Sequence, residues 1–259
     1  MALNLRQLKI LELIQPTGRV LINDLVEKFS VTPQTIRRDI TNLCDLGFLQ
    51  RHHGGAALPQ LSSVENIAYR TRKAINAEAK KVIGILATEQ IPENSSLFIN
   101  IGTTTEEVAK ALRLRNKLRV ITNNLNVAGI LSDRAGIELI VAGGVVRHRD
   151  HAIVGESAVD FISQFKVDFG VIGISGIDSD GTLLDFDYRE VRIAQAIIKN
   201  SRKVILVADH SKFSRNAMVK LGHLRQISTL VTDRKPSEEM LEVIQASETK
   251  LVITDSEEG

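Results

Sequence analysis

The first fifty residues carry apolar side chains at the spacing of short helices. Leu11 and Ile14 lie on an apolar stripe that predicts a first helix, and Pro16 interrupts this pattern. A second short helix is expected from about Asn23, a suitable N-cap residue, to Phe29. We therefore expect this part of the chain to be built from short amphipathic helices.

A third helix has the clearest start signal in the sequence. The Thr32 hydroxyl can accept a hydrogen bond from an amide of the first turn, and Pro33 stands at the first helical position, where a missing N–H costs nothing. The apolar stripe of this helix includes Ile36 and Leu43, and Gly47 suits the left-handed residue beyond its end. The stripe predicts that the helix packs against the other two.

A small β-hairpin is expected directly after the third helix. Residues 48–51 have the pattern of a short strand, which enters a turn at the His-His-Gly-Gly segment 52–55. Three short helices followed by a hairpin predict a winged helix-turn-helix domain over residues 1–57. Residues 58–76 show no clear period and are expected to form a linker and a lead-in helix.

From residue 77 to residue 259 extended aliphatic runs alternate with helical stretches, such as 106–112 and 190–199. Near-continuous aliphatic strands separated by helices predict an α/β domain with a mostly parallel sheet covered on both faces. Ligands of such sheets bind outside the carboxyl ends of the strands. The expected strands are Leu97–Ile101, Leu118–Ile121, Ile137–Val141, Phe169–Ile174, Val204–Val207, Leu230–Thr232 and Leu251–Ile253.

Composition and charge narrow the possible functions. The chain has 259 residues and a formal net charge of only +2, so a nucleic-acid surface requires a local concentration of positive charge. The single cysteine, Cys44, is expected to be a small core residue. No apolar run approaches the roughly 20 residues that span a bilayer. Charged residues also interrupt the N-terminal leucines, so we expect a cytoplasmic protein with no membrane partner.

The third helix and the hairpin present polar and basic side chains away from the apolar stripe. In a major groove a glutamine can pair with adenine, and an arginine can reach guanine or a phosphate. Such residues in isolation are most often solvated surface, but here a capped helix, an apolar stripe and a hairpin coincide. No metal site is expected, since the paired histidines lack suitably spaced cysteine or carboxylate ligands. The candidate DNA-binding residues are Thr32, Gln34, Thr35, Arg37, Arg38, Arg51, His52 and His53.

The segment after the first aliphatic strand has the form of an anion-binding turn. Gly102 permits a tight turn, and the hydroxyls and amides of residues 103–105 can face an anion at the start of a helix. A capped helix start without a ligand would look the same. However, small or polar residues follow the other strands too, and parallel strands share one carboxyl edge, so we expect a polar pocket there. These loops are Thr122–Asn124, Ala142–Gly144 with Arg147, Ser175–Asp178 and Asp209–Lys212.

Two motifs in the first part of the chain closely resemble those of DeoR-type bacterial repressors. Residues 30–39 are similar to the recognition helix of that family, and residues 51–56 are similar to its wing and domain junction. The resemblance runs from about Leu5 to about Asp233. It implies a transcription repressor that binds double-stranded operator DNA. We expect a homo-oligomer, dimer or tetramer, because repressor dimers bind palindromic half-sites.

The resemblance further implies a sensor domain with the ribose-5-phosphate isomerase and sugar-phosphate deaminase fold. Thr103 and Thr104 match the phosphate loop of the isomerases, and Asp178 and Lys212 match an aspartate and a lysine of their active-site motifs. Glu190 falls near their catalytic glutamate. The family thus implies a phosphorylated small-molecule effector.

The chain also departs from the isomerase pattern. Ser175 stands where those enzymes have their first aspartate, and residues 184–188 replace a lysine-triple-glycine segment. A proton-shuttling isomerase needs its full set of acid, base and cation, so we expect binding without catalysis and no cofactor. Residues 155–181 are similar to those of family members that respond to glycerol 3-phosphate. The resemblance therefore implies this effector, and another sugar or polyol phosphate is the alternative. The candidate effector-binding residues are Gly102, Thr103, Thr104, Thr105, Asn123, Asn124, Gly143, Gly144, Arg147, Asp178, Asp185, Glu190 and Lys212.

Three functions remain open at the level of sequence. The first is an effector-controlled repressor, and the second is a sugar-phosphate isomerase with a DNA-binding head. The third is an architectural DNA-binding protein whose large domain only oligomerises. The missing catalytic residues disfavour the enzyme, and the polar strand-end loops disfavour the architectural protein.

Overall fold

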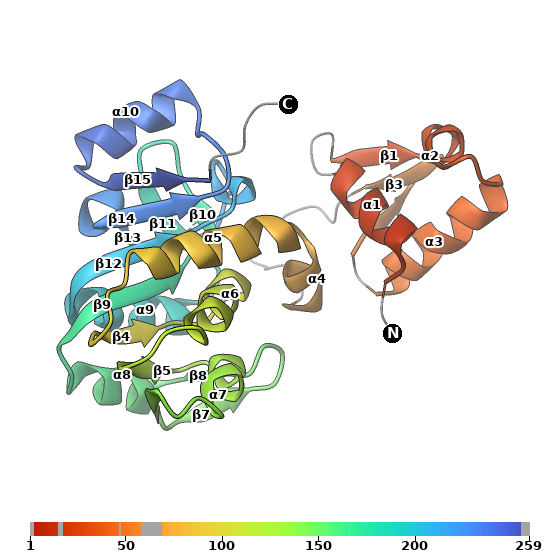
Figure 1. Cartoon of the computed structure of the whole chain (residues 1–259). Helices are drawn as coiled ribbons and strands as arrows, with labels where there is room; N and C mark the ends of the chain where they lie inside the picture. Colours follow the sequence, from red (N-terminus) through yellow and green to blue (C-terminus); the bar gives the residue numbers. More distant parts are fainter. Residues whose placement is uncertain (1–2, 15–17, 47, 58–68, 255–259) are drawn as a thin grey trace. The chain divides into compact units, whose positions relative to one another are not determined.

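A computed structural model of the chain describes residues 3–14, 18–46, 48–57 and 69–254. The chain divides into two compact units, Met1–Ala77 and Glu78–Gly259 (Figure 1). Pro16, Gly47 and residues 58–68 of the expected linker lie outside the described residues. The expected limits 1–57, 58–76 and 77–259 therefore stay predictions.

The first unit is a winged helix-turn-helix, as the sequence predicts. Its three short strands form an antiparallel sheet in the order β1-β3-β2. Ile10, Ile14, Ile36 and Leu43 are among the residues that fill its core. The elements are α1 (Leu5–Ile14), β1 (Arg19–Leu21), α2 (Ile22–Phe29), α3 (Pro33–Asp45), β2 (Gln50–His52) and β3 (Gly55–Ala57).

The start of α3 follows the sequence, whereas the start of α2 does not. The Thr32 hydroxyl caps α3 by accepting from the Thr35 amide at 3.3 Å, and Pro33 is the first helical residue. The expected N-cap Asn23 is wrong: α2 begins at Ile22, directly after Leu21. The reason is tertiary, because Leu21 ends a wing strand and the Ile22 amide donates to the Gly54 carbonyl.

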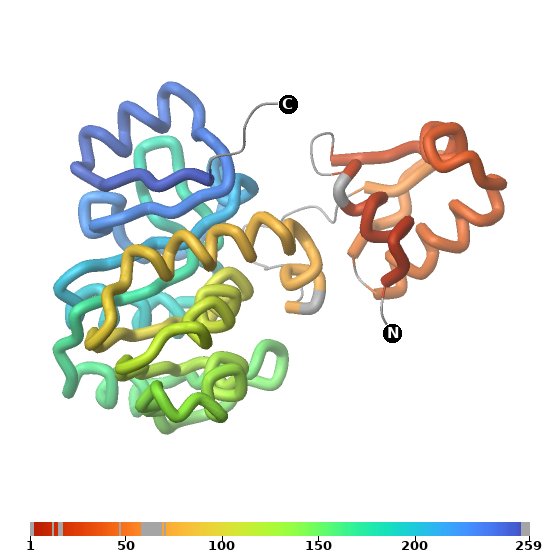
Figure 2. The backbone as a smooth tube through the Cα atoms, in the orientation of Figure 1, coloured from red at the N-terminus to blue at the C-terminus, as the bar shows by residue number. Residues whose placement is uncertain are grey.

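The second unit is built on a seven-stranded parallel sheet, with the order β15-β14-β12-β9-β4-β5-β6. Each of the seven aliphatic runs forms one of these strands. Figure 2 follows the backbone along the sheet from the yellow and green strands to the blue ones. The strands are β4 (Ser96–Ile99), β5 (Leu118–Thr122), β6 (Ile137–Val141), β9 (Val167–Gly173), β12 (Ser201–Val207), β14 (Thr229–Thr232) and β15 (Lys250–Ile253).

Helices cover both faces of this sheet. On one face α5, α6 and α7 pack through a core that contains Ile83, Val108 and Leu131. On the other face α8, α9 and α10 pack through a core that contains Ile162 and Ile193. These helices are α5 (Ala77–Glu89), α6 (Thr103–Leu112), α7 (Leu125–Leu131), α8 (Glu156–Ser163), α9 (Tyr188–Lys199) and α10 (Glu238–Ala246), with short 3-10 turns at η1 (His210–Lys212) and η2 (Leu224–Gln226). A further short helix, α4 (Tyr69–Ala74), precedes α5 and belongs to the first unit.

The direction of chain winding reverses between β4 and β9, which are neighbours in the sheet although β5 and β6 follow β4 in sequence. Such a switch point opens a crevice at the carboxyl ends of the strands. Two antiparallel additions lie in connections of this sheet: the β7–β8 hairpin (Val145–Arg147 and Ala152–Val154) and a small sheet of β10 (Gly176–Ile177), β11 (Thr182–Asp185) and β13 (Val219–His223). The expected pocket therefore corresponds to a defined place in the fold.

Candidate functional sites

The exposed side of α3 and the wing carry the residues expected to bind DNA. Gln34, Arg37 and Arg38 are exposed on α3, and Thr35 is half-buried. Thr32, Arg51, His52 and His53 are also exposed. The Arg51 guanidinium reaches from β2 to α3 and donates to the Thr41 hydroxyl at 3.2 Å. The helix and the wing thus both present exposed polar and basic side chains, and this hydrogen bond connects the two elements.

A buried carboxylate that sequence reasoning missed positions α3. Asp39 is only 4% exposed, and its Oδ2 accepts from Arg6 Nε of α1 at 2.5 Å. Its Oδ1 accepts from Gln7 Nε2, also of α1, at 3.1 Å. Because Asp39 faces away from Arg38 and Gln34, it fixes the helix from behind. No signal in the sequence indicated that Asp39 is buried, because it directly follows two arginines that were expected to be exposed.

The turn after β4 lies at the switch point of the sheet. Gly102 has a φ of +146°, which favours glycine, and it is the N-cap residue of α6. A Cβ on Gly173, at the end of β9, would lie 3.6 Å from a Thr105 methyl group, so the turn packs against that strand. The amides in the first turn of a helix bind anions. Residues 103–105 form this first turn, so α6 begins three residues before the expected helical stretch 106–112.

The three threonines of this turn differ in their surroundings. The Thr105 hydroxyl is fully buried and donates to the carbonyl oxygens of Asn100 and Gly102, each at 2.8 Å. Thr103 and Thr104 are 8% and 6% exposed. Thr105 therefore holds the turn from inside, and an anion contact by its hydroxyl would break these bonds.

The segment after β5 connects this turn to the β7–β8 hairpin. Asn124 caps α7 by accepting from the Asn126 amide at 2.9 Å, and its Nδ2 lies 3.5 Å from Glu106 Oε1. Asn126 Nδ2 donates to Glu106 Oε1 at 2.9 Å and to the Asp150 carbonyl at 3.1 Å. Asn124 thus holds the protein's own backbone and side chains together. Glu106, 2% exposed, was missed because an acidic residue in a first helical turn is commonplace.

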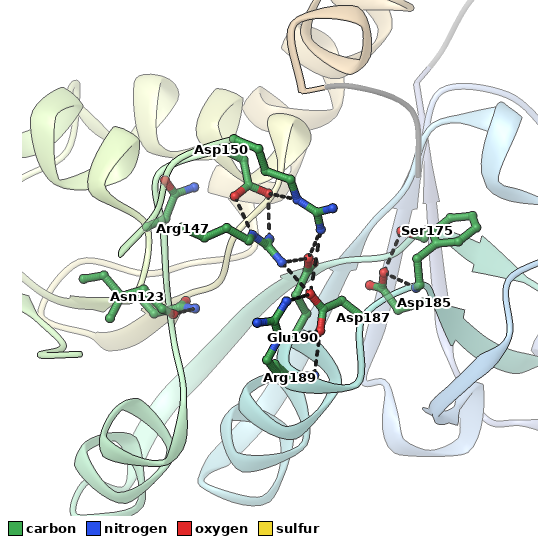
Figure 3. A network of polar contacts seen from close by, with 12 residues as sticks. Asn123, Arg147, Asp150, Ser175, Asp185, Asp187, Arg189 and Glu190 are labelled. Atoms are coloured by element: carbon green, nitrogen blue, oxygen red, sulfur yellow. Dashed lines mark hydrogen bonds and ion pairs between the residues drawn. The ribbon is translucent and has the colours of Figure 1, made fainter. Parts of the chain in front are cut away.

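Arg147 lies at the centre of a buried network of charges (Figure 3). Its Nε and Nη2 donate to the two carboxylate oxygens of Asp150 at 2.8 and 2.7 Å. Its Nη1 lies 2.9 Å from Asp187 Oδ2 and 2.5 Å from Glu190 Oε1. Arg149 also donates to Glu190 Oε1, at 3.0 Å. The network joins the β7–β8 hairpin to the start of α9.

The electrostatics of the network follow from these contacts. Burial opposes the charge of Arg147, but the hydrogen bond to Asp150 and the charge of Glu190 outweigh it and raise the pKa of the guanidinium. The hydrogen bond from Arg189 lowers the pKa of Asp187 to about 2. Arg147 and Asp187 are therefore both charged at neutral pH. Arg147 and Glu190 were predicted from the sequence to bind the effector, and in this structure they form an ion pair with each other.

Ser175 and Asp185 meet where β9 leaves the sheet. The Ser175 hydroxyl donates to Asp185 Oδ1 at 2.9 Å, and both residues are buried, at 6% and 7% exposure. Arg215, also 7% exposed, stacks on the Phe186 ring at 5.0 Å from its centroid. Arg215 is a basic residue near Asp185 that the sequence did not single out, because it follows the strand-end loop by several residues.

Asp178 lies apart from the residues at the carboxyl edge. The β10–β11 register pairs Gly176 with Leu184, which places Asp178 at the turn end of this hairpin and Asp185 at its other end. Asp178 is exposed, and its carboxylate accepts from the Ser179 amide at 2.8 Å. The position of Asp178 therefore does not support its predicted contact with the effector, and that contact stays a prediction.

The remaining candidates follow β6 and β12. Lys212 is half-buried in η1, which Asp209 caps by accepting from the Ser211 amide at 3.0 Å. Gly143 and Gly144 are exposed after the edge strand β6 and lead into the β7–β8 hairpin. Lys212 belongs to the carboxyl edge, two strands from the turn after β4. The glycines serve a bend at the sheet edge.

Other features of the described residues bear on the chemistry of the chain. Within residues 3–14, 18–46, 48–57 and 69–254, no three His, Cys, Asp or Glu side chains gather as a metal site would need. No helix in those ranges is long and apolar enough to cross a membrane. Cys44 packs beside the core of the first unit, and burial raises the pKa of its thiol.

Comparison with protein families identifies both units. Residues 6–61 match the DeoR-like helix-turn-helix domain, and residues 75–234 match the DeoR C terminal sensor domain. The second match alone spans more than half of the chain. The chain belongs to the DeoR family.

Relatives over nearly the whole length are transcription repressors. The chain is 53% identical to the glycerol-3-phosphate regulon repressor of Escherichia coli (strain K12), over 91% of this chain and 92% of the relative. It is 47% identical to the Haemophilus influenzae protein of the same name, over 96% of each. Identity to the HTH-type transcriptional repressor CsqR of Escherichia coli is 38%, over 96% of this chain and 95% of the relative.

Solved structures resemble part of the chain. Ribose 5 phosphate isomerase A from Neisseria gonorrhoeae is 17% identical with a TM-score of 0.36, over 52% of each chain. The β subunit of eIF2B from Chaetomium thermophilum is 18% identical with a TM-score of 0.47, over 70% of this chain and 56% of the other. Both likenesses are distant and concern the fold.

Proposed function

We propose that this chain is a repressor of glycerol or glycerol 3-phosphate metabolism genes, and that glycerol 3-phosphate is its inducer. Its relatives named for the glycerol-3-phosphate regulon and the two DeoR domains support a DNA-binding repressor with a sugar-phosphate sensor. The observation that carries the effector part is the Gly102 turn at the sheet's switch point, where the first turn of α6 meets β9. That is the place where α/β sheets bind phosphorylated ligands.

Operator binding is assigned to α3 and the wing. Arg37 and Arg38 contact guanine or phosphate, Gln34 reads adenine, and the wing residues around His52 touch the backbone or the neighbouring minor groove. Their exposure on the outer side of a helix held by Asp39 supports this assignment. A single recognition helix makes few contacts, so we propose a homo-oligomer that reads paired half-sites. Sedimentation showing a monomer both alone and on DNA would contradict it.

The effector phosphate is assigned to the Gly102 turn, with Thr103, Thr104 and Lys212 around it. The hydroxyl groups of the effector face the end of β5, and Asp185 lines the opposite side of the proposed site. The protein only binds this ligand and does not convert it. Ser175 supports this statement: at the place of the isomerases' first aspartate it carries a hydroxyl that donates to Asp185, and a hydroxyl is a weak base.

The hydrogen bonds from α6 to α9 provide a route by which effector binding at the Gly102 turn changes the rest of the unit. Glu106 follows directly after the turn, and through Asn126 it holds the loop of Asp150. Asp150 holds Arg147, which binds Asp187 and Glu190 of α9. A phosphate on the turn would shift α6 and strain this chain of bonds. A 100-fold loss of operator affinity needs only about 2.7 kcal/mol of coupling.

Titration calorimetry and operator binding test the proposal together. Glycerol 3-phosphate, glycerol and several sugar phosphates are titrated into the whole protein, and operator affinity is measured with and without each compound. We expect glycerol 3-phosphate to bind and to weaken operator binding, and glycerol to do neither. If another sugar phosphate binds and glycerol 3-phosphate does not, that compound is the effector in place of glycerol 3-phosphate. No binding of any phosphorylated compound would refute the sensor function.

Lys212→Ala separates effector binding from DNA binding. Loss of a charged hydrogen-bond donor to a phosphate is expected to cost about 1.5–3 kcal/mol, with operator affinity unchanged. Lys117→Ala, at the amino end of β5 and exposed, is the matched control. Equal loss of effector affinity in both variants, or loss of operator binding in Lys212→Ala, would contradict the assignment.

A further inference from the structure

Two asparagine side chains occupy neighbouring positions at the carboxyl ends of β4 and β5. The register pairs Ile99 with Thr122, so Asn100 and Asn123 are the next pair along the two strands. Asn100 continues the ladder, because its amide donates to the Val171 carbonyl at 3.0 Å. Neighbouring strands lie about 4.8 Å apart, so residues in register are in contact range.

Both carboxamides belong to the same face of the sheet. Phe98 and Ile121, two residues before each asparagine, pack in one core together with Ile153. Residues two positions apart in a strand share a face. Asn123 Nδ2 donates to the Ile153 carbonyl at 3.2 Å, which places this carboxamide under β8. The face is therefore the one covered by the β7–β8 hairpin and α9.

The two carboxamide oxygens are buried acceptors. Asn100 is 4% exposed and Asn123 is 1% exposed. Within the described part of the chain, no donor reaches Oδ1 of either residue. Buried polar atoms are nearly always hydrogen-bonded, and a buried acceptor without a donor is costly. Two such acceptors on adjacent strands call for a donor that the described residues do not provide.

We infer that these two oxygens accept hydrogen bonds from hydroxyl groups of the effector and so select a polyol phosphate over its keto counterpart. The inference rests on the phosphate site proposed above. Asn100 precedes Gly102 by two residues, so their Cα atoms are at most about 7.6 Å apart, within reach of a three-carbon molecule. A carboxamide oxygen only accepts, so it binds an alcohol and repels a carbonyl oxygen. Being uncharged, it does not repel the phosphate.

This pairing revises which asparagine meets the ligand. Asn124, expected from sequence beside Asn123, is occupied by the Asn126 amide and Glu106. Asn100 takes its place because strand alternation directs it to the same face as Asn123. Both oxygens lie below the surface, so a ligand reaches them when the β7–β8 hairpin moves aside. That hairpin carries Arg147, which connects hydroxyl recognition to the network that reaches α9.

Ligands that differ at one carbon test the inference on the unaltered protein. Calorimetry compares glycerol 3-phosphate with dihydroxyacetone phosphate, where a carbonyl replaces the central hydroxyl, and with propyl phosphate, which has no hydroxyl. We expect each analogue to bind at least about tenfold more weakly than glycerol 3-phosphate. Equal affinities for all three would overturn the inference while leaving the phosphate site intact. If none of the three compounds binds, the proposed function is refuted instead.

Asn100→Leu tests the residue itself. This variant removes one of the two acceptors at similar volume, so the ratio of affinities for glycerol 3-phosphate and dihydroxyacetone phosphate should fall toward one, while affinity for propyl phosphate is kept. Asn116→Leu, exposed before the amino end of β5, should keep the ratio of the unaltered protein. A folded Asn100→Leu protein with an unchanged ratio would refute the role of Asn100. If this variant fails to fold, the ligand series decides.

Discussion

The two units of this chain use arginine in opposite ways. Arg38 stands exposed on a helix whose back is fixed to α1, so its charge is available to a large anionic partner. The Arg147 side chain is 11% exposed and is bound by carboxylates of Asp150, Asp187 and Glu190. An exposed arginine changes affinity for a partner, whereas a buried and paired arginine holds segments of its own chain together. The difference assigns DNA contact to the first unit and internal coupling to the second.

The largest effect is expected when Arg147 is removed. Arg147→Met leaves three carboxylates close together without their central cation, and should destabilise the sensor unit by about 3–5 kcal/mol. Arg189→Met is the matched control, because Arg189 also pairs with Asp187 but its side chain is 49% exposed. An exposed pair contributes roughly 0–1 kcal/mol. Urea unfolding followed at several pH values measures both, and equal losses would erase the contrast between buried and exposed arginines.

The pH dependence of stability sharpens the description of the same network. The pKa of Asp187 is lowered to about 2, so its ionised form stabilises the folded state above its unfolded pKa of about 4. This contribution, about 2 kcal/mol, is lost as the pH falls from 4 through 2. The stability difference between the unaltered protein and Asp187→Asn should shrink over that window. A difference independent of pH between 4 and 2 would show that the charge of Asp187 contributes nothing.

A similar or smaller effect is expected at the DNA surface. Arg38→Ala should weaken operator binding by about 1–3 kcal/mol and leave both stability and effector binding unchanged. Arg119→Ala, which removes an exposed arginine from β5 of the sensor unit, is the control and should leave operator affinity unchanged. Electrophoretic mobility shifts at a fixed salt concentration measure both. If Arg38→Ala lowered stability as much as Arg147→Met, the distinction between the two arginines would be wrong.

The smallest effect is expected at the cap of α3. Thr32→Ala removes the acceptor for the Thr35 amide and should destabilise the DNA-binding unit by about 1 kcal/mol. Thr32→Ser keeps a hydroxyl and should restore most of this loss. Amide exchange at the start of α3 measures the effect. Faster exchange in the sensor unit instead would mean that the cap acts on the whole chain and not on α3.

Local signals in the sequence determined the elements and the family of this protein. The cap and stripe of α3 depend on residues within one helix, and each parallel strand is a continuous aliphatic run because both of its faces are buried. The same signals placed the Gly102 turn at the end of a strand. Asn23 was misplaced as a cap because the wing sheet, formed by residues far along the chain, fixed where α2 begins.

Only the tertiary structure decided which polar residues meet. The sequence predicted that Arg147 and Glu190 bind the effector, and the fold pairs these two side chains with each other across 43 positions of sequence, counted from 147 to 190. Strand order and register set Asn100 beside Asn123, and the β10–β11 register sets Asp178 and Asp185 at opposite ends of their hairpin. Hydrogen bonds and ion pairs act over a few ångströms, so their partners are fixed by distance in space, which a linear pattern of residues does not contain.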